Sequence, residues 1–146
     1  VRNPIDEKIM SKGVAGSTWQ TKKKPQLQWM SKEIIRVLES HPEFRCRKLK
    51  ILDIGGGKGC LANYLGLAVD DVEIKVVDIA AGAVANGQMR AKRMNTPVEF
   101  QIADASSEEL DDTEADVVIA LHACGHLSDV ALAHAVSRKA GFVICP

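Results

Sequence analysis

The chain contains 146 residues, 46% of them hydrophobic and 26% charged, and its 19 basic residues balance 19 acidic residues. This length suits one packed core and is short for two domains. The zero net charge excludes a global field that would draw the chain to nucleic acid or to an anionic membrane, although it neither indicates nor excludes RNA binding.

The first segment, residues 1–24, is polar and shows neither helical nor alternating periodicity. We expect an N-terminal arm or loop there. It ends in the run Lys22-Lys23-Lys24, and three lysines form a solvated tether or a helix entry more often than a phosphate-binding patch.

From Pro25 onward the pattern becomes helical, with proline suited to the first turn and His41-Pro42 ending the run. Apolar residues recur every three or four positions, which predicts an amphipathic helix with one buried face. These residues are Leu27, Met30, Ile34, Ile35 and Leu38.

Beyond this helix, short apolar runs alternate with helical segments, a pattern typical of βαβ units and a mostly parallel sheet. Strands are predicted over 50–54, 73–77, 98–102, 116–121 and 141–145. Helices are predicted over about 60–68, 82–94 and 128–139. The segment 106–109, Ser-Ser-Glu-Glu, has capping-box spacing and predicts a short helix before the fourth strand.

The predicted fold class is α/β, a Rossmann-like, doubly wound parallel sheet in the order 3-2-1-4-5. Ligands of such sheets bind beyond the carboxyl ends of the strands, at the switch point between the first and the fourth. The chain begins at Val1 and stops at Pro146, directly after an apolar run. We therefore expect a domain over 25–146 that is part of a longer protein and lacks the last strands of its sheet.

A glycine-rich segment, Asp53-Ile-Gly-Gly-Gly-Lys-Gly59, follows the first strand and opens a helix. Glycines let the backbone turn sharply and approach a ligand closely. The dinucleotide fingerprint counted from Gly55 requires its third glycine at position 60, where this chain has Cys60. A P-loop is excluded because no Gly-Lys-Ser/Thr follows. The spacing resembles the first motif of class I methyltransferases, which implies S-adenosylmethionine as the cofactor.

Two further acids follow strands. Asp78 ends the second strand, where a carboxylate accepts bonds from ribose hydroxyls, and Asp104 follows the third, a position that contacts the adenine amino group in methyltransferases. The alternative is that these acids are helix caps and solvated strand ends. The predicted cofactor contacts are Asp53, Gly55, Gly57, Gly59, Asp78, Ile79, Asp104, Ala105 and Leu121.

The segment 120–129, Ala-Leu-His-Ala-Cys-Gly-His-Leu-Ser-Asp, runs off the fourth strand. With the following helix and the terminal Gly-Phe-Val-Ile-Cys-Pro, it resembles the methyltransferase domain of glutathione S-transferase C-terminal domain-containing proteins. More distantly, it resembles tRNA 2′-O-methyltransferases with an H-x-C-G-x-x-T-D element. The resemblance covers about residues 20–146. Ser128 stands where the family usually has threonine, which keeps the hydroxyl, and the chain stops before the further cysteines typical of the family.

The resemblance implies that His122 and Cys124 line the acceptor side of the pocket, and that Asp129 helps to fix the turn into the next helix. We predict His122 and Cys124 as the catalytic residues. An imidazole exchanges protons near neutral pH, so His122 is suited to orient an acceptor or to act as a base. The alternative is a histidine bonded to backbone at a strand end.

A metal site is the other interpretation of this segment, because His122, Cys124 and His126 are ligand-type residues and Cys145 is expected at the end of the adjacent strand. Their spacing crosses a strand-to-helix turn and does not by itself make them converge. We therefore predict no metal. His134 lies in the middle of a predicted helix and is expected to be a surface or core residue.

The four cysteines show no C-x-x-C pairing and no dense disulfide spacing, which favours a reducing compartment. No apolar stretch approaches the roughly 18 residues of a membrane span, and no signal peptide is visible. We expect a cytoplasmic protein, with the nucleus as the alternative and no membrane partner.

The predicted function is SN2 transfer of the methyl group of S-adenosylmethionine to a nucleophile held near the fourth strand. The acceptor is not identified, and the tRNA-methylating relatives imply an RNA hydroxyl. One alternative is a nicotinamide-dependent oxidoreductase, which would share the fold and Asp78 but is opposed by Cys60. A second is a non-catalytic module that binds a cofactor or a partner protein.

Overall fold

The computed structural model describes residues 19–146, so most of the arm predicted over 1–24 lies outside the described residues. Inside them, Trp19–Lys23 forms a π-helical turn that runs directly into the helix α2 (Lys24–Glu39). The lysine run is therefore helical rather than looped. Pro25 permits this because its missing N–H falls in the first turn, where no intrahelical bond is needed.

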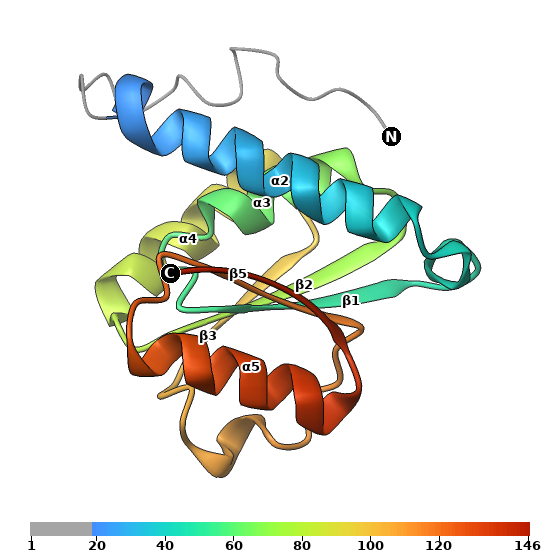
Figure 1. Cartoon of the computed structure of the whole chain (residues 1–146). Coiled ribbons are helices and arrows are strands. Elements are labelled where there is room, and N and C mark those ends of the chain that lie inside the picture. The colour runs from blue at the N-terminus through green and yellow to red at the C-terminus, as the bar shows by residue number, and fades with distance from the viewer. Residues whose placement is uncertain (1–18) are drawn as a thin grey trace.

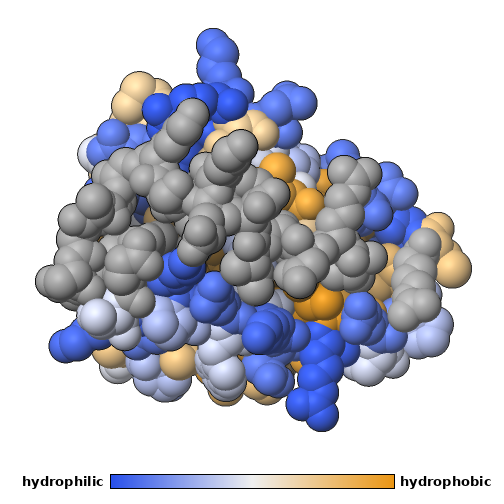
Figure 2. Space-filling model, turned by 90° about the horizontal axis from the view of Figure 1, so that it is seen from above, coloured by the Kyte–Doolittle hydropathy of each residue, from blue (hydrophilic) through white to orange (hydrophobic). Residues whose placement is uncertain are grey.

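Helix α2 is amphipathic, as its apolar periodicity predicts. Its buried residues are Leu27, Met30, Ser31, Ile34 and Leu38. The buried hydroxyl of Ser31 donates to the Leu27 carbonyl at 2.7 Å. The helix ends at Ser40, and the 3-10 helix η2 (Pro42–Arg45) follows. Figure 2, which looks down from above, shows mostly hydrophilic residues with smaller hydrophobic patches.

The sheet confirms the predicted topology. Five parallel strands lie in the order β3-β2-β1-β4-β5. Their bounds are β1 (Leu49–Ile54), β2 (Val72–Asp78), β3 (Val98–Ile102), β4 (Val117–Leu121) and β5 (Gly141–Cys145). Asp116, predicted as the first residue of the fourth strand, lies just before it, although its backbone N–H still donates to the Lys50 carbonyl and its carboxylate accepts from the Arg47 guanidinium.

Helices cover both faces of the sheet (Figure 1). The helices α2, α3 (Cys60–Ala68) and α4 (Ala81–Met94) contribute to one core, which includes Ile51, Ile74 and Ile119. On the other face α5 (His126–Arg138) packs against Leu52 and Val118. Strands with apolar side chains on both faces explain the continuous apolar runs in the sequence. Within residues 19–146, no helix is long and apolar enough to cross a membrane.

The short helix predicted before the fourth strand is present as η3 (Glu108–Leu110), but the capping box over 106–109 does not form, because the N-cap, Ser107, makes no side-chain cap bond. Asp104 competes for both serines, accepting the Ser106 N–H at 2.8 Å on its carboxylate and the Ser107 hydroxyl at 2.7 Å on its carbonyl. Helix α5 also begins two residues early, because Gly125 adopts φ 59° and ψ −131°, a conformation open to glycine.

Candidate functional site

The predicted site residues meet at one edge of the sheet. The glycine loop follows β1, Asp78 ends β2, Asp104 follows β3, and His122 follows β4. These strands are parallel neighbours, with Ile54 paired to Val77 and Asp78 paired to Ile102. Their carboxyl ends therefore lie side by side, which is where ligands bind in open α/β sheets.

The glycine loop is a cradle that requires glycine. Gly55, Gly57 and Gly59 have positive φ values of 69°, 55° and 60°. The Gly55 N–H donates to the Val77 carbonyl at 2.8 Å, which ties the loop to the neighbouring strand. A Cβ atom at Gly55 would lie 2.7 Å from the Cδ2 atom of Leu127 in α5. Any side chain there would push the Leu127 side chain aside and strain the backbone.

Asp78 holds this loop in place. Its Oδ2 atom accepts the Gly57 N–H at 2.8 Å, and its Oδ1 atom accepts the Ala80 N–H at 2.8 Å. The carboxylate thus links the glycine loop to the turn that leads into α4. Each carboxylate oxygen has further acceptor capacity, so these bonds leave room for the ribose contact expected from the sequence. No sequence signal indicated this second role.

Asp53 is buried beneath the loop. Its side chain is 1% exposed, and neither carboxylate oxygen has a hydrogen-bond partner within residues 19–146. A Cβ atom at Gly56 would lie 2.6 Å from the Asp53 Cγ atom, so the carboxyl group stands directly against the loop. Burial, with a smaller contribution from the charge of Asp78, raises the pKa of Asp53 to about 8. A positive charge bound above the loop would stabilise the ionised carboxylate.

The other predicted cofactor residues differ in exposure. Asp104 is exposed, and its carboxylate is oriented by the Ser106 N–H. Ala105 is buried, and its carbonyl lies 2.7 Å from the Nε2 atom of His134. Ile79 is 73% exposed beside Asp78, and Leu121 is half-buried. The exposed side chain of Ile79 offers an apolar surface next to Asp78.

The turn after β4 presents His122 and Cys124 to solvent. His122 is exposed and has a left-handed backbone, with φ 63°, which costs a non-glycine residue about 1 kcal/mol or more. The turn is held from both sides, since the Ala123 N–H donates to the Cys145 carbonyl at 3.3 Å and the Ser128 hydroxyl donates to the Ala123 carbonyl. Within residues 19–146 the His122 ring makes no hydrogen bond, so the backbone-bonded alternative finds no support.

Ser128 therefore fixes the turn, a role that the family resemblance implied for Asp129. The exposed carboxylate of Asp129 lies in the first turn of α5, where a negative charge is favourable to the helix. His126 is exposed at the start of that helix, and Cys145 is half-buried. In the part of the chain that the structure describes, no group of three or more His, Cys, Asp or Glu side chains could hold a metal ion.

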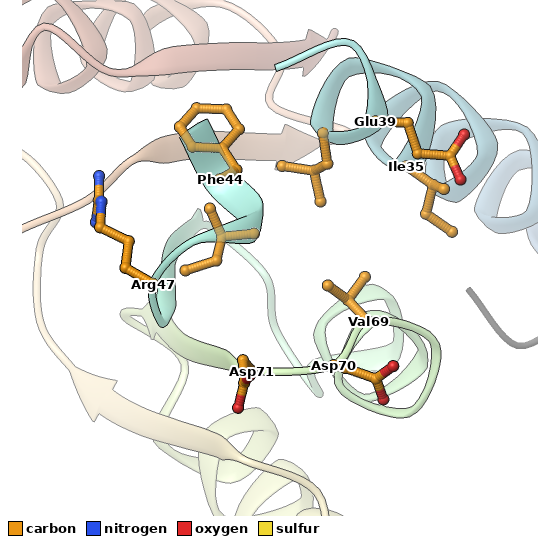
Figure 3. Close-up of a pocket in the computed structure, with 9 residues that line it drawn as sticks. Ile35, Glu39, Phe44, Arg47, Val69, Asp70 and Asp71 are labelled. Atoms are coloured by element: carbon orange, nitrogen blue, oxygen red, sulfur yellow. The ribbon is translucent and has the colours of Figure 1, made fainter. Parts of the chain in front are cut away.

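A cavity of about 420 Å³ lies away from this edge of the sheet. Figure 3 shows its walls, where Ile35, Phe44 and Val69 provide apolar surface and Asp70 and Asp71 lie at the bottom of the view. These residues come from the end of α2, from η2 and from the turn before β2, at the amino ends of the strands. The cavity is therefore distinct from the glycine loop, which follows the carboxyl end of β1.

Comparisons with known proteins identify the family. A family model described as "Methyltransferase domain" matches residues 22–145. A release factor glutamine methyltransferase of Koribacter versatilis is 31% identical over 83 residues, which are 57% of this chain and 29% of that protein.

Solved structures share the fold. The YcgJ protein of Bacillus subtilis has a TM-score of 0.59 and 26% identity, over 83% of this chain and 50% of that chain. An S-adenosylmethionine-dependent methyltransferase from Aquifex aeolicus has a TM-score of 0.55 and 18% identity, over 67% and 56% of the two chains.

This chain thus spans less than a third of the Koribacter protein and about half of either solved chain. The match over 22–145 confirms the predicted methyltransferase family, and the sheet order agrees with the fold of its structural neighbours. The chain belongs to a family of methyltransferase domains, and its fold is that of S-adenosylmethionine-dependent methyltransferases.

Proposed function

We propose that this domain binds S-adenosylmethionine beyond the carboxyl ends of β1 to β4 and transfers its methyl group to an acceptor held near the end of β4. The observation that carries the proposal is the unpartnered, fully buried carboxyl group of Asp53 beneath a loop of three left-handed glycines. A buried acid without partners is costly unless something compensates it. A cationic amino-acid group seated on the loop would do so.

The residues at this edge fit the three parts of the cofactor. Gly55, Gly57 and Gly59 form the cradle for its amino-acid part, above Asp53. Asp78 accepts the ribose hydroxyls with its remaining lone pairs. A second set contacts the adenine: Ile79, Asp104, Ala105 and Leu121. Three acids along the site complement a ligand that carries an ammonium and a sulfonium group.

When bound, S-adenosylmethionine would supply a methyl group activated on a positively charged sulfur. The chain's own contribution is to hold that ligand and to orient an acceptor at His122 and Cys124, and such alignment supplies most of the acceleration in group transfers of this kind. His122 is presented to solvent by a turn anchored to β5 and α5, so its imidazole is available to orient an acceptor or to accept its proton.

The oxidoreductase alternative is disfavoured by the residue at the third position of the dinucleotide fingerprint. Cys60 begins α3 there, and its sulfur accepts a hydrogen bond from Arg90 at 3.1 Å. A non-catalytic module remains the competing hypothesis, and methyl transfer distinguishes it from an enzyme.

The acceptor that we propose first is RNA, because segment 120–129 resembles the corresponding segment of tRNA 2′-O-methyltransferases. A glutamine side chain of a protein is the second, since the chain is similar over 83 residues to a release factor glutamine methyltransferase. The proposal includes a cytoplasmic location, because Cys46, Cys60, Cys124 and Cys145 are all free thiols.

The proposal is tested by calorimetric titration with S-adenosylhomocysteine and, separately, with NAD. The expected result is saturable binding of S-adenosylhomocysteine alone, unchanged in a control variant, Asp70→Asn, at the opposite end of the sheet. Transfer of labelled methyl groups to RNA or to protein then separates an enzyme from a binding module. Binding of NAD in place of S-adenosylhomocysteine would overturn the proposal.

A further inference from the structure

A polar pair in α5, His134 and Arg138, lies outside the set of residues proposed to contact the cofactor. His134 is 9% exposed, and both ring nitrogens have partners. Its Nε2 atom lies 2.7 Å from the Ala105 carbonyl oxygen, and its Nδ1 atom lies 2.9 Å from a guanidinium nitrogen of Arg138. Arg138 is one helical turn further along the same face.

These partners determine where the ring carries its proton. A guanidinium group has only N–H donors and no acceptor, so Arg138 donates and the Nδ1 atom of His134 accepts. The ring proton therefore sits on Nε2 and is donated to the Ala105 carbonyl. The bond to Arg138 thus makes His134 a donor of fixed orientation aimed at one backbone oxygen.

Arg138 makes two further hydrogen bonds to the chain that follows Ala105. Its Nε atom donates to the Thr113 carbonyl at 2.6 Å, and its Nη2 atom donates to the Leu110 carbonyl. The side chains of His134 and Arg138 thus hold the two ends of the segment 105–113 against α5. This segment begins next to Asp104 and includes η3.

Asp104 itself is oriented by the turn that this contact anchors. Its carboxylate accepts the Ser106 N–H at 2.8 Å, and its carbonyl accepts the Ser107 N–H at 2.9 Å. Both donors follow Ala105 directly, so a displacement of the Ala105 carbonyl would move the carboxylate. Asp104 is exposed and lies two residues beyond the end of β3, after the hydrogen bond from the Ala103 N–H to the Asp78 carbonyl at 3.3 Å.

We propose that His134 is a positioning residue for recognition of the cofactor's adenine: by holding the Ala105 carbonyl, it sets where Asp104 and Ala105 stand toward the amino group of the base. This inference rests on the proposed function. It adds to that function a basis for specificity: the contact that His134 makes from α5 lets the site distinguish adenine from other purines.

The test compares two ligands by calorimetry on the full 146-residue chain. One is S-adenosylhomocysteine, and the other is S-inosylhomocysteine, in which oxygen replaces the amino group of the base. We expect the native chain to prefer the first by about tenfold or more, the effect of one well-placed hydrogen bond. His134→Leu should reduce that preference to less than about threefold. His134→Gln, whose amide N–H can still donate to Ala105, should restore most of it.

A purely structural role would lower thermal stability in both variants and leave the preference unchanged, and that result in a folded His134→Leu chain overturns the inference. Equal binding of both ligands by the native chain also overturns it, while the proposed function stands. If the native chain binds neither ligand, the proposed function fails and the inference fails with it.

A measurement on the native chain keeps the test decisive if His134→Leu does not fold. The His134 ring should show an Nε2-bound proton by nitrogen NMR, and its resonance should shift when S-adenosylhomocysteine is added. A proton on Nδ1, or a resonance unchanged at saturating ligand, overturns the inference.

Discussion

The Oδ2 atom of Asp78 accepts the Gly57 N–H at 2.8 Å, so the acid at the end of β2 holds the loop that follows β1. The same carboxylate accepts the Ala80 N–H through its other oxygen. One side chain therefore organises two of the four backbone segments proposed to surround the cofactor. Loss of this side chain should affect both the loop and the ligand.

Asp78→Ala is expected to weaken S-adenosylhomocysteine binding by about a hundredfold and to lower the free energy of unfolding by about 1–3 kcal/mol, since two N–H groups lose their acceptor. Asp78→Asn keeps one acceptor oxygen, so its losses of affinity and of stability should be smaller than those of Asp78→Ala. Calorimetry and urea unfolding measure the two effects. An Asp78→Ala chain with native affinity would remove Asp78 from the site.

Asp53 should make stability depend on pH in an unusual direction. Its pKa is about 8 in the folded chain and near 3.8 when unfolded, so between these values the folded state holds a proton that the unfolded state has lost. The stability that Asp53 contributes is therefore complete below pH 3.8. Above that pH the free energy of unfolding falls as pH rises, by at most about 1.4 kcal/mol per pH unit, and it levels off above pH 8.

Asparagine cannot ionise, so Asp53→Asn should flatten the dependence of the unfolding free energy on pH. Urea unfolding between pH 5 and about 9 measures this dependence. The native chain and the variant would then differ more at pH 8 than at pH 5. Parallel profiles would show that Asp53 does not titrate in this range, and would remove the argument that a cationic ligand compensates it.

Ligand binding should release protons for the same reason. If an ammonium group seated over Gly56 favours the ionised form of Asp53, binding near pH 7 shifts its proton to the buffer. Calorimetric heats measured in buffers of different ionisation enthalpy report this release. Heats independent of the buffer, at unchanged affinity, would contradict the compensation of Asp53 by ligand charge.

Gly55→Ala is predicted to be damaging although it adds a single methyl group. The residue has φ 69°, and the new Cβ atom would lie 2.7 Å from Leu127. We expect a loss of about 1–3 kcal/mol in unfolding free energy and weaker cofactor binding. Gly82→Ala in α4 is the matched control, because no atom lies within 4 Å of its new methyl group, and it should be neutral or stabilising. Equal effects of the two substitutions would refute this account.

His122→Asn should lower the rate of methyl transfer by about a hundredfold or more, the range typical of a lost acid or base, without changing S-adenosylhomocysteine affinity. Asparagine tolerates the left-handed backbone of His122, so the fold is preserved. Single-turnover rates, with an acceptor found by transfer of labelled methyl groups to RNA or protein, measure the effect. A native rate in this variant would assign His122 to a structural role.

The sequence predicted the sheet because its strands are buried on both faces and appear as apolar runs such as Val117–Leu121. It also located the glycine loop and the acids, because their spacing follows the strands. The contacts that organise the site were not predictable in the same way. The bond from His134 to Ala105 joins residues far apart in the sequence, and a histidine in mid-helix gives no indication of its partner.

Local competition explains the other differences. Ser106 and Ser107 have the spacing of a cap, yet Asp104 takes their hydrogen bonds. The early start of α5 depends on the backbone angles of Gly125, which a sequence pattern does not specify. Both cases lie in loops. In the first, neighbouring side chains compete for the same backbone groups, and in the second a glycine adopts angles open to few other residues.

The most direct test of the central claim is to locate the bound cofactor product on the chain by nitrogen–proton NMR. We predict that S-adenosylhomocysteine shifts the amide resonances of Gly55, Gly57 and Ile79 and leaves those of Val69, Asp70 and Asp71, at the cavity in Figure 3, unchanged. Shifts at the cavity with none at the glycine loop would contradict the claim that the cofactor binds beyond the carboxyl ends of the strands.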